Sequence, residues 1–288
     1  MAAPVRYRSS AEDSGRWAGF PFRDGDIVIS TRSKHGTTWL QMICGLLVFR
    51  TPDLPAPLPA LSPWLDWLGA PRDGVMDRLE AQDHRRFIKT HTPLDGLPLD
   101  PRATYIVVGR HPLDAAVSLY HQGANLDRAR IAELTGNPEI PSDRPPLTDW
   151  LEDWVAGDPS PQDELDSLPG VLHHLTDAWA RRDEGNVVLV HYADLLADLD
   201  GEMGRLAARL DLAAPTPDLV AAARFDAMRD RADELAPDAG GILRDRQAFF
   251  RRGSTARADL SADLVTRYDA RAVALAPADL LPWLHRPA

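Results

Sequence analysis

Four short segments with apolar, strand-favouring centres constrain the fold more than any other feature of this sequence. They are residues 26–30, 86–89, 105–109 and 186–191. Continuous apolarity of this kind is typical of strands that are buried on both faces of a sheet. Helical patterns lie between and after them, at 37–48, 113–123, 172–182 and 195–210. This alternation predicts an α/β fold in which a central parallel β-sheet is flanked by helices.

The domain organisation follows from what interrupts this alternation. Neither an internal repeat nor a domain linker separates the strands, so we expect a single domain over residues 1–288. Three stretches fall outside the alternation, and Pro-rich segments at 52–59 and 138–146 mark two of them as surface connections. We therefore expect helical or loop insertions around residues 50–80, 125–170 and 224–250.

The charge balance limits the partners that this chain can bind. A net charge of −11 argues against nucleic acid or an anionic membrane surface as the main partner. An anionic ligand would then need a local basic pocket. No apolar run is long enough to predict a membrane segment. The one cysteine, Cys44, excludes an intramolecular disulfide, and we expect a cytoplasmic protein.

Lysine is scarce in this sequence. Of the 32 basic residues, only Lys34 and Lys89 are lysines. A lysine cannot be replaced by arginine where a compact point charge must reach a reacting group. We therefore take both lysines as candidate functional residues.

The loop after the first apolar segment is suited to an anion. It reads Ser30-Thr-Arg-Ser-Lys-His-Gly-Thr-Thr-Trp39 and leads into a helical pattern. A strand, a polar loop with a glycine and a helix that opens with hydroxyl residues together aim backbone N–H groups at a phosphate-like group. The alternative is a simple helix cap beside a solvated lysine. The ATP-binding pattern G-x-x-x-x-G-K-[ST] is absent, because Lys34 precedes Gly36.

Polar residues also follow the other three apolar segments. Lys89-Thr90-His91 ends the second, Arg110 follows the third, and His191-Tyr192 ends the fourth. The carboxyl ends of parallel strands meet at one edge of a sheet, where ligands bind in such folds. We therefore expect these residues to surround one site, with Lys and Arg neutralising the anion and no metal required.

Four segments of the sequence together resemble motifs of the cytosolic-type sulfotransferases, which use 3′-phosphoadenosine 5′-phosphosulfate (PAPS). Residues 31–39, TRSKHGTTW, resemble the family's 5′-phosphosulfate loop TYPKSGTTW. Residues 110–118, RHPLDAAVS, resemble its 3′-phosphate motif RNPKDVAVS. Residues 87–91, FIKTH, match the segment with the catalytic base, and residues 250–253, FRRG, resemble a late nucleotide-binding segment.

The resemblance implies a nucleotide-kinase-like fold of the P-loop type and assigns roles to residues of this chain. The residues implied to hold the 5′-phosphosulfate are Lys34, His35, Gly36, Thr37, Thr38 and Trp39. Those implied to bind the 3′-phosphate and the rest of the nucleotide are Arg110, Ser118, Tyr192, Phe225, Met228, Phe250, Arg251, Arg252 and Gly253. PAPS is then the co-substrate.

The sequence departs from the family pattern at several positions. Arg32-Ser33 stands where the family often has Tyr-Pro, and His35 stands where it has Ser. After Gly253 the usual G-D-W is missing, and Ala223 occupies a position that commonly holds an adenine-contacting Thr. These departures put the affinity for the nucleotide in question.

The implied reaction is transfer of a sulfuryl group from PAPS to an acceptor hydroxyl. His91 would take the acceptor proton, Lys34 would neutralise the leaving phosphate oxygen, and Lys89 would steady the sulfuryl oxygens or the acceptor. Two alternatives stay open, a nucleotide or small-molecule kinase and a non-catalytic nucleotide-binding protein.

The acceptor is indicated by one aromatic segment. Leu61-Ser-Pro-Trp-Leu-Asp-Trp-Leu68 contains Trp64 and Trp67, which form either a wall of the acceptor site or part of an ordinary packed helix. This segment and residues 87–97 resemble actinobacterial glycolipid sulfotransferases. We therefore expect a lipid-linked sugar or another apolar alcohol as acceptor, with a phenol or a small metabolite as the alternative.

Overall fold

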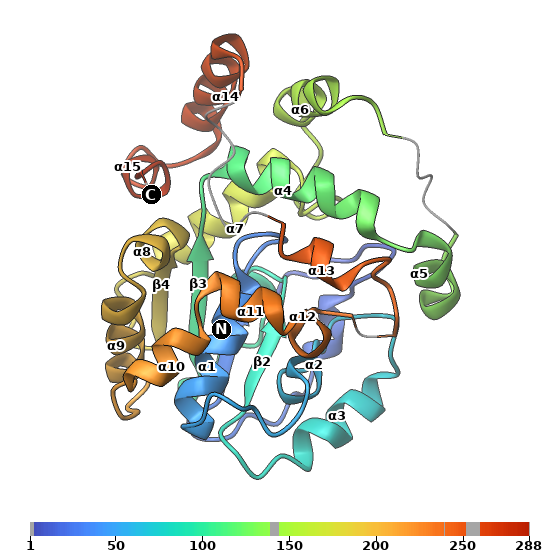
Figure 1. Cartoon of the computed structure of the whole chain (residues 1–288). Coiled ribbons are helices and arrows are strands. Elements are labelled where there is room, and N and C mark those ends of the chain that lie inside the picture. Colours follow the sequence, from blue (N-terminus) through green and yellow to red (C-terminus); the bar gives the residue numbers. More distant parts are fainter. Residues whose placement is uncertain (1–2, 139–143, 239, 252–259, 288) are drawn as a thin grey trace.

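A parallel sheet forms the centre of the molecule (Figure 1). The computed structural model describes residues 3–138, 144–238, 240–251 and 260–287. Within these residues the sheet has the order β2-β1-β3-β4. Its strands are β1 (Ile27–Ser30), β2 (Phe87–Thr90), β3 (Thr104–Gly109) and β4 (Val187–His191). All pairings are parallel, so the prediction of a parallel sheet is confirmed.

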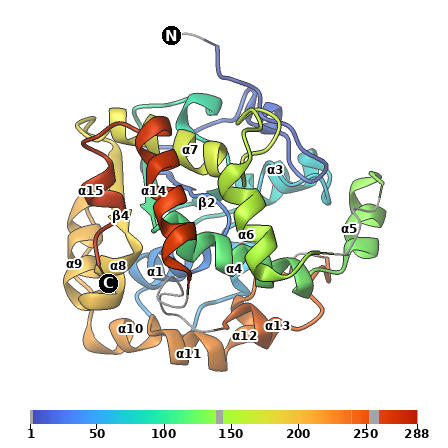
Figure 2. The ribbon, with the colours of Figure 1, turned by 90° about the horizontal axis from the view of Figure 1, so that it is seen from above.

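Each strand buries both of its faces, which explains its continuous apolarity. Ile27 and Ile29 of β1 pack into one hydrophobic core with α1 (Thr37–Phe49) and α9 (Leu199–Arg209). Val28 points the other way, into a second core with α7 (Leu168–Ala180) and α14 (Ala262–Leu275). Figure 2 shows these two helical layers on opposite sides of the sheet. Flanking helices on both faces confirm the predicted α/β class.

The predicted helices are found, with two corrections to their bounds. The helical pattern at 113–123 corresponds to α4 (Pro112–Asn125). The helix predicted at 172–182 is α7, which begins four residues earlier because the Ser167 hydroxyl accepts a hydrogen bond from the Gly170 amide and caps it. The prediction of one helix over 195–210 is wrong, because the structure has two helices there, α8 (Tyr192–Ala197) and α9. Asp198 lies between them: its non-helical backbone ends α8, and its carboxylate caps α9.

The three stretches that interrupt the alternation each contain short helices. The first contains α2 (Leu58–Leu61) and α3 (Arg72–Glu80), and the second contains α5 (Arg128–Thr135) and α6 (Leu147–Ala156). The third contains α11 (Phe225–Asp230), α12 (Ala232–Leu235) and α13 (Arg246–Phe249). The remaining elements are two short 3-10 helices (Ser14–Trp17 and Leu94–Gly96), α10 (Pro217–Ala222) and α15 (Leu281–Leu284).

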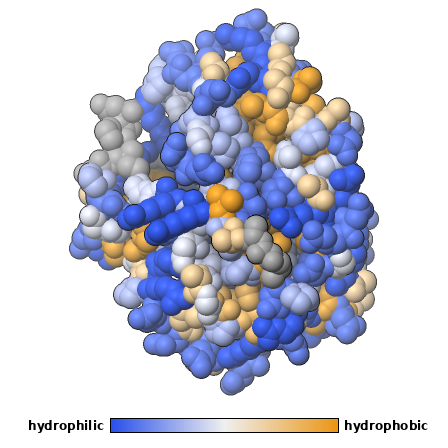
Figure 3. All heavy atoms as spheres, turned by 180° about the vertical axis from the view of Figure 1, so that it is seen from behind, coloured by the Kyte–Doolittle hydropathy of each residue, from blue (hydrophilic) through white to orange (hydrophobic). Residues whose placement is uncertain are grey.

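The face of the molecule seen in Figure 3 is largely hydrophilic. Figure 3 shows the face opposite to that of Figure 1, where apolar side chains gather only in small groups among polar ones. Among the described residues, none of the helices combines the length and apolarity needed to span a bilayer.

Candidate active site

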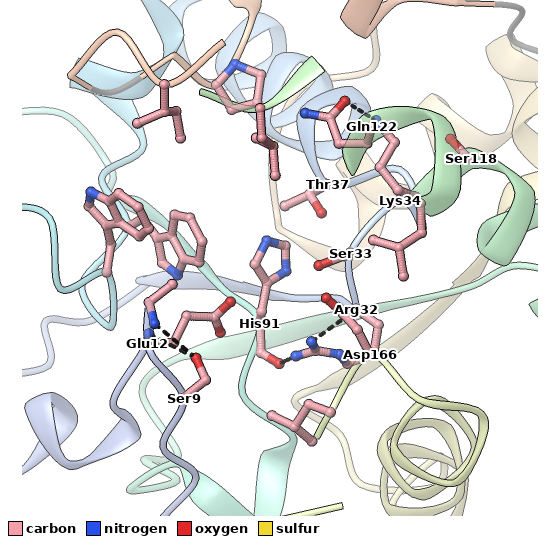
Figure 4. A pocket seen from close by; sticks show the side chains of 18 of the residues that line it. Ser9, Glu12, Arg32, Ser33, Lys34, Thr37, His91, Ser118, Gln122 and Asp166 are labelled. Carbon is pink, nitrogen blue, oxygen red and sulfur yellow. Dashed lines mark hydrogen bonds and ion pairs between the residues drawn. The ribbon is translucent and has the colours of Figure 1, made fainter. Parts of the chain in front are cut away.

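A cavity of about 590 Å³ opens at the edge of the sheet where all four strands end. Its lining includes residues that follow β1, β2, β3 and β4, and a close view shows Lys34, Thr37 and His91 among the side chains that line it (Figure 4). We call one part the loop end, formed around residues 34–39 and Arg110. We call the other part the tryptophan end, formed by Trp64, Trp67, Lys89 and Glu12.

The loop end presents the uncapped start of a helix. Gly36 is the N-cap of α1, and no side chain caps this helix. The first backbone N–H groups of a helix lack carbonyl partners within the helix, so here they are available to a ligand. Gly36 has a φ of 102°, and a Cβ at this position would lie 3.0 Å from the Tyr192 ring. Only glycine fits this turn without strain.

Basic side chains crowd the loop end. The pKa of Lys34 is lowered to about 7, mainly by burial and in part by the positive charges of Arg110, Lys89 and Arg251. Arg110 donates to the Lys34 carbonyl at 2.8 Å, which holds the guanidinium beside the loop. Like charges so close together are costly until an anion neutralises them. The loop end is therefore built for a strongly negative group.

Aromatic and apolar side chains continue the cavity beyond the basic cluster. Tyr192 packs edge-on against Trp39, with ring centroids 5.3 Å apart, and Arg110 lies over the Tyr192 ring at 4.3 Å. Phe225 contacts Phe250 with centroids 6.2 Å apart. Apolar planes of this size can enclose a flat heterocyclic base next to its phosphates.

Helix α4 closes the loop end with polar side chains. Ser118 and Gln122 both line the cavity from this helix. The Lys34 ammonium donates to the Gln122 amide oxygen at 3.3 Å and lies 3.9 Å from the centre of the Phe249 ring. This contact holds the lysine head inside the cavity (Figure 4).

The hydrogen bonding of His91 fixes which ring nitrogen is available. Its Nδ1 lies within hydrogen-bond distance of the Thr31 backbone carbonyl, which can only accept. Nδ1 must therefore carry the proton, and Nε2 keeps a free lone pair. Burial and the nearby charges of Lys89 and Arg32 lower the His91 pKa well below its usual value. At neutral pH the ring is uncharged and ready to accept a proton.

Lys89, on β2 two residues before His91, belongs to the tryptophan end. Burial lowers its pKa to about 8, while the negative charges of Glu12 and Asp66 act in the opposite direction. Its ammonium lies 3.8 Å from the centre of the Trp64 ring. Among the described residues it has no hydrogen-bond acceptor, so it is free to bind a ligand oxygen.

The two lysines of the sequence thus line the same cavity. Almost all other site residues predicted from the sequence line it too: Gly36, Thr37, Thr38, Trp39, Trp64, Trp67, His91, Arg110, Ser118, Tyr192, Phe225, Met228, Phe250 and Arg251. Arg252 and Gly253 lie outside the described residues.

His35 is the predicted site residue that the structure does not bring to the cavity. Its side chain is fully buried, with Nδ1 3.0 Å from the Ser33 carbonyl. Its backbone N–H donates to the Arg32 carbonyl within the turn. Burial lowers its pKa to about 4, so His35 is a neutral residue that supports the loop from behind.

Several residues that line the cavity were not predicted from the sequence as site residues. Arg32 donates to the Asp166 carboxylate at 2.6 Å and also to the His91 carbonyl, and it joins the loop to residues far along the chain. Glu12 comes from the N-terminal segment, and burial raises its pKa to about 7. The substitution of Arg for the family's Tyr at position 32 was the one visible hint.

The family assignment is decided by comparison with known proteins. The family described as "Sulfotransferase domain" matches residues 24–257, which is most of the chain. This chain is a member of the sulfotransferase family. It is therefore an enzyme of sulfuryl transfer, as the motif resemblance predicted, and the kinase and non-catalytic alternatives are not supported.

Individual sulfotransferases extend the similarity over the full chain. A glycolipid sulfotransferase of Mycobacterium bovis is 45% identical, with 99% of this chain and 95% of the relative covered. A glycolipid sulfotransferase of Mycobacterium tuberculosis is 44% identical over the same shares. The matching segments include both the loop end and the tryptophan end of the cavity.

Solved sulfotransferase structures share the fold. A mouse sulfotransferase complexed with PAP, adenosine 3′,5′-bisphosphate, superposes with a TM-score of 0.68 at 20% identity, covering 95% of this chain and 92% of the other. Retinol dehydratase in complex with retinol and PAP gives a TM-score of 0.68 at 20% identity, covering 89% and 82%. The predicted P-loop-type sulfotransferase fold is thus confirmed.

Proposed function

We propose that this sulfotransferase transfers the sulfuryl group of PAPS to a hydroxyl of a glycolipid. The observation that carries the proposal is the meeting of Lys34, Lys89 and His91 in one cavity, beside an uncapped helix N-terminus. The two mycobacterial relatives, named as glycolipid sulfotransferases, support the class of acceptor.

The loop end fits the donor nucleotide. Amides at the start of α1 and the Lys34 ammonium suit the 5′-phosphosulfate, while Arg110 and Ser118 suit a 3′-phosphate. A bound anion would relieve the repulsion that lowers the Lys34 pKa. Tyr192 and Phe225 would contact the adenine. Arg252 and Gly253 retain the nucleotide-binding role that the motif implies for them.

The transfer step requires one base and one group that neutralises the leaving oxygen. The acceptor hydroxyl gives its proton to Nε2 of His91 while its oxygen forms a bond to sulfur, and the bond from sulfur to the phosphate oxygen breaks. Lys34 offsets the charge that develops on that phosphate oxygen, and Lys89 contacts the sulfuryl or acceptor oxygens. Positioning and charge stabilisation supply most of the rate, as in phosphoryl transfer.

The tryptophan end suits an acceptor with an apolar part. Trp64 and Trp67 line the cavity, which supports the acceptor-wall interpretation, while Trp67 is also packed into the hydrophobic core. Leu126 and Ile131 extend the lining with aliphatic side chains, which can hold a hydrocarbon chain. The compartment and oligomeric state do not enter this proposal, and a cytoplasmic location stays a prediction.

The test is transfer of a labelled sulfuryl group from PAPS to a panel of glycolipid, free sugar, phenol and simple alcohol acceptors. We expect label in the glycolipid, with a higher kcat/KM than for any other acceptor. A panel in which the phenols are preferred would contradict the glycolipid acceptor. Failure of every panel member, with intact PAP binding, would contradict the proposed acceptor class as a whole.

A further inference from the structure

Three hydrogen-bonding groups meet at the tryptophan end and have no hydrogen-bond partner there among the described residues. They are the Glu12 carboxylate, the Lys89 ammonium and Nε2 of His91. The proposed transfer step uses His91 and Lys89, but it leaves the Glu12 carboxylate unexplained. Glu12 is half-buried and lines the cavity, so its carboxylate can accept a hydrogen bond from a bound ligand. The structure therefore leaves room for a ligand group that donates to Glu12.

The backbone places Glu12 beside the reacting groups. Residues 11–13 pair with the segment that contains Trp67: the Leu68 N–H donates to the Ala11 carbonyl at 2.9 Å, and the Asp13 N–H donates to the Asp66 carbonyl at 3.0 Å. The same segment continues to the edge of β2, where the Lys89 N–H donates to the Pro63 carbonyl at 3.1 Å. Glu12 is thus held by main-chain pairing, and Figure 4 shows its carboxylate next to His91.

An aromatic plane lies beside this carboxylate. Trp64 and Trp67 are stacked, with ring centroids 5.1 Å apart and planes 18° from parallel. The His91 ring meets Trp64 edge-on at 4.9 Å, which brings the aromatic surface up to the proposed base. Trp64 is the half-buried member of this pair, the Lys89 ammonium lies over its ring as a donor, and Glu12 adds an acceptor in the same part of the cavity.

This combination matches the chemistry of a sugar ring. A pyranose has a flat face of C–H groups that can pack on an indole, and its edge carries adjacent hydroxyls that both donate and accept. A phenol or a simple alcohol has one hydroxyl, so after giving its proton to His91 it has no donor left for Glu12.

We propose that Glu12, Lys89 and the Trp64–Trp67 pair form a sugar subsite in which Glu12 accepts a hydrogen bond from the hydroxyl adjacent to the reacting one. Glu12 thereby selects an acceptor that carries neighbouring hydroxyls. This inference rests on the proposed function and narrows its acceptor to the sugar part of the glycolipid.

The experiment compares two probes that share an alkyl chain. Calorimetry measures octyl glucoside and 1-octanol binding to the enzyme saturated with PAP, for the wild type, Glu12→Gln and Glu12→Ala. Glu80→Gln is the matched control, because Glu80 is an exposed residue on α3 that does not line the cavity. PAP affinity on the same preparations shows whether each variant is folded.

We expect Glu12→Ala to weaken octyl glucoside binding by about tenfold or more relative to 1-octanol, the scale of a lost charged hydrogen bond. Glu12→Gln, which keeps an acceptor oxygen without the charge, should give a smaller loss, and Glu80→Gln should give none. Equal losses for both probes, or no loss for either, would overturn the subsite.

Labelled transfer to octyl glucoside separates this inference from the proposed function. Glu12-dependent binding without transfer would refute the proposed glycolipid transfer and keep the subsite. Transfer that is accompanied by Glu12-independent binding would keep the proposed function and refute the subsite.

Discussion

The loop end and the tryptophan end of the cavity are built in different ways. The loop end comes from short segments that directly follow β1 and β3, so local sequence carries its chemistry. The tryptophan end joins β2 to the N-terminal segment and to residues 63–68, which lie far apart in the chain. The loop end therefore consists of contiguous motifs, whereas the proposed acceptor subsite depends on contacts between distant segments.

This contrast predicts that substitutions can impair the function of one end of the cavity without impairing the function of the other. Substitutions at the loop end should change nucleotide affinity or the leaving-group step. Substitutions at the tryptophan end should change acceptor handling and leave PAP binding nearly intact.

The largest separation is expected for His91→Ala. Loss of a general base typically lowers turnover by roughly 10² to 10⁴-fold. PAP affinity should hardly change, because the proposed role of His91 is to take the proton of the acceptor hydroxyl and not to bind the nucleotide. Single-turnover transfer, PAP affinity and melting temperature are measured on the same preparation.

A merely structural role for His91 makes the opposite forecast. Stability and PAP affinity would then fall together, while transfer per folded molecule would survive. That outcome would remove His91 as the base and with it the proposed proton transfer.

The next largest effect is expected for Lys34→Arg. A planar guanidinium cannot take the place of a compact ammonium aimed at one oxygen, so turnover should fall by roughly 10²-fold or more. The Gln122 contact and the packing against Phe249 are also shaped for the lysine head. Presteady-state transfer with saturating PAPS measures the effect, and full activity would show that lysine at this position has no mechanistic role.

Arg110→Ala should act on nucleotide affinity. We expect PAP to bind more weakly by roughly 2–3 kcal/mol, the scale of a charge-assisted contact, or about 30 to 150-fold. Binding of adenosine 5′-phosphosulfate, which lacks the 3′-phosphate, should change little. Calorimetry with both nucleotides distinguishes this role, and an equal loss for the two would assign Arg110 to the loop structure instead.

The smallest effect concerns the anchoring of the N-terminal segment. Tyr7 donates to Asp95 at 2.9 Å, and His173 lies 3.2 Å from the same carboxylate. Asp95 raises the His173 pKa above its usual value of about 6.5. The stabilisation from protonated His173 is therefore complete below pH about 6.5 and is lost as the pH rises through the raised pKa.

The anchoring is measured by urea unfolding of the wild type and of His173→Gln. Because about a third of the His173 side chain is exposed and solvent screens the pair, we expect a difference of only about 0.5–1 kcal/mol at pH 5.5. The difference should disappear at pH 9. A difference that grows with pH would show that the Asp95 interaction does not depend on the histidine charge.

The sequence predicts the strands and the loop end because their signals are local. The apolar runs of the buried strands can be identified without knowledge of any tertiary contact, and so can the polar loop at residues 34–39 that follows the first strand. The break at Asp198 was missed because a polar residue within a helical pattern does not show that it will cap a second helix. Glu12 was missed because its role depends on pairing with residue 67, more than fifty positions later.

Recognition of a 3′-phosphate by the loop end is tested most directly by comparing PAP with ATP as ligands of the wild type. The proposed function assigns the 3′-phosphate, which ATP lacks, to Arg110 and Ser118, and the N-terminus of α1 is followed by no Walker lysine. Calorimetry with and without magnesium should give PAP an affinity at least roughly 30-fold higher, the scale of one charge-assisted phosphate contact. Equal affinities, or ATP binding that requires magnesium, would contradict a loop end built to recognise the 3′-phosphate.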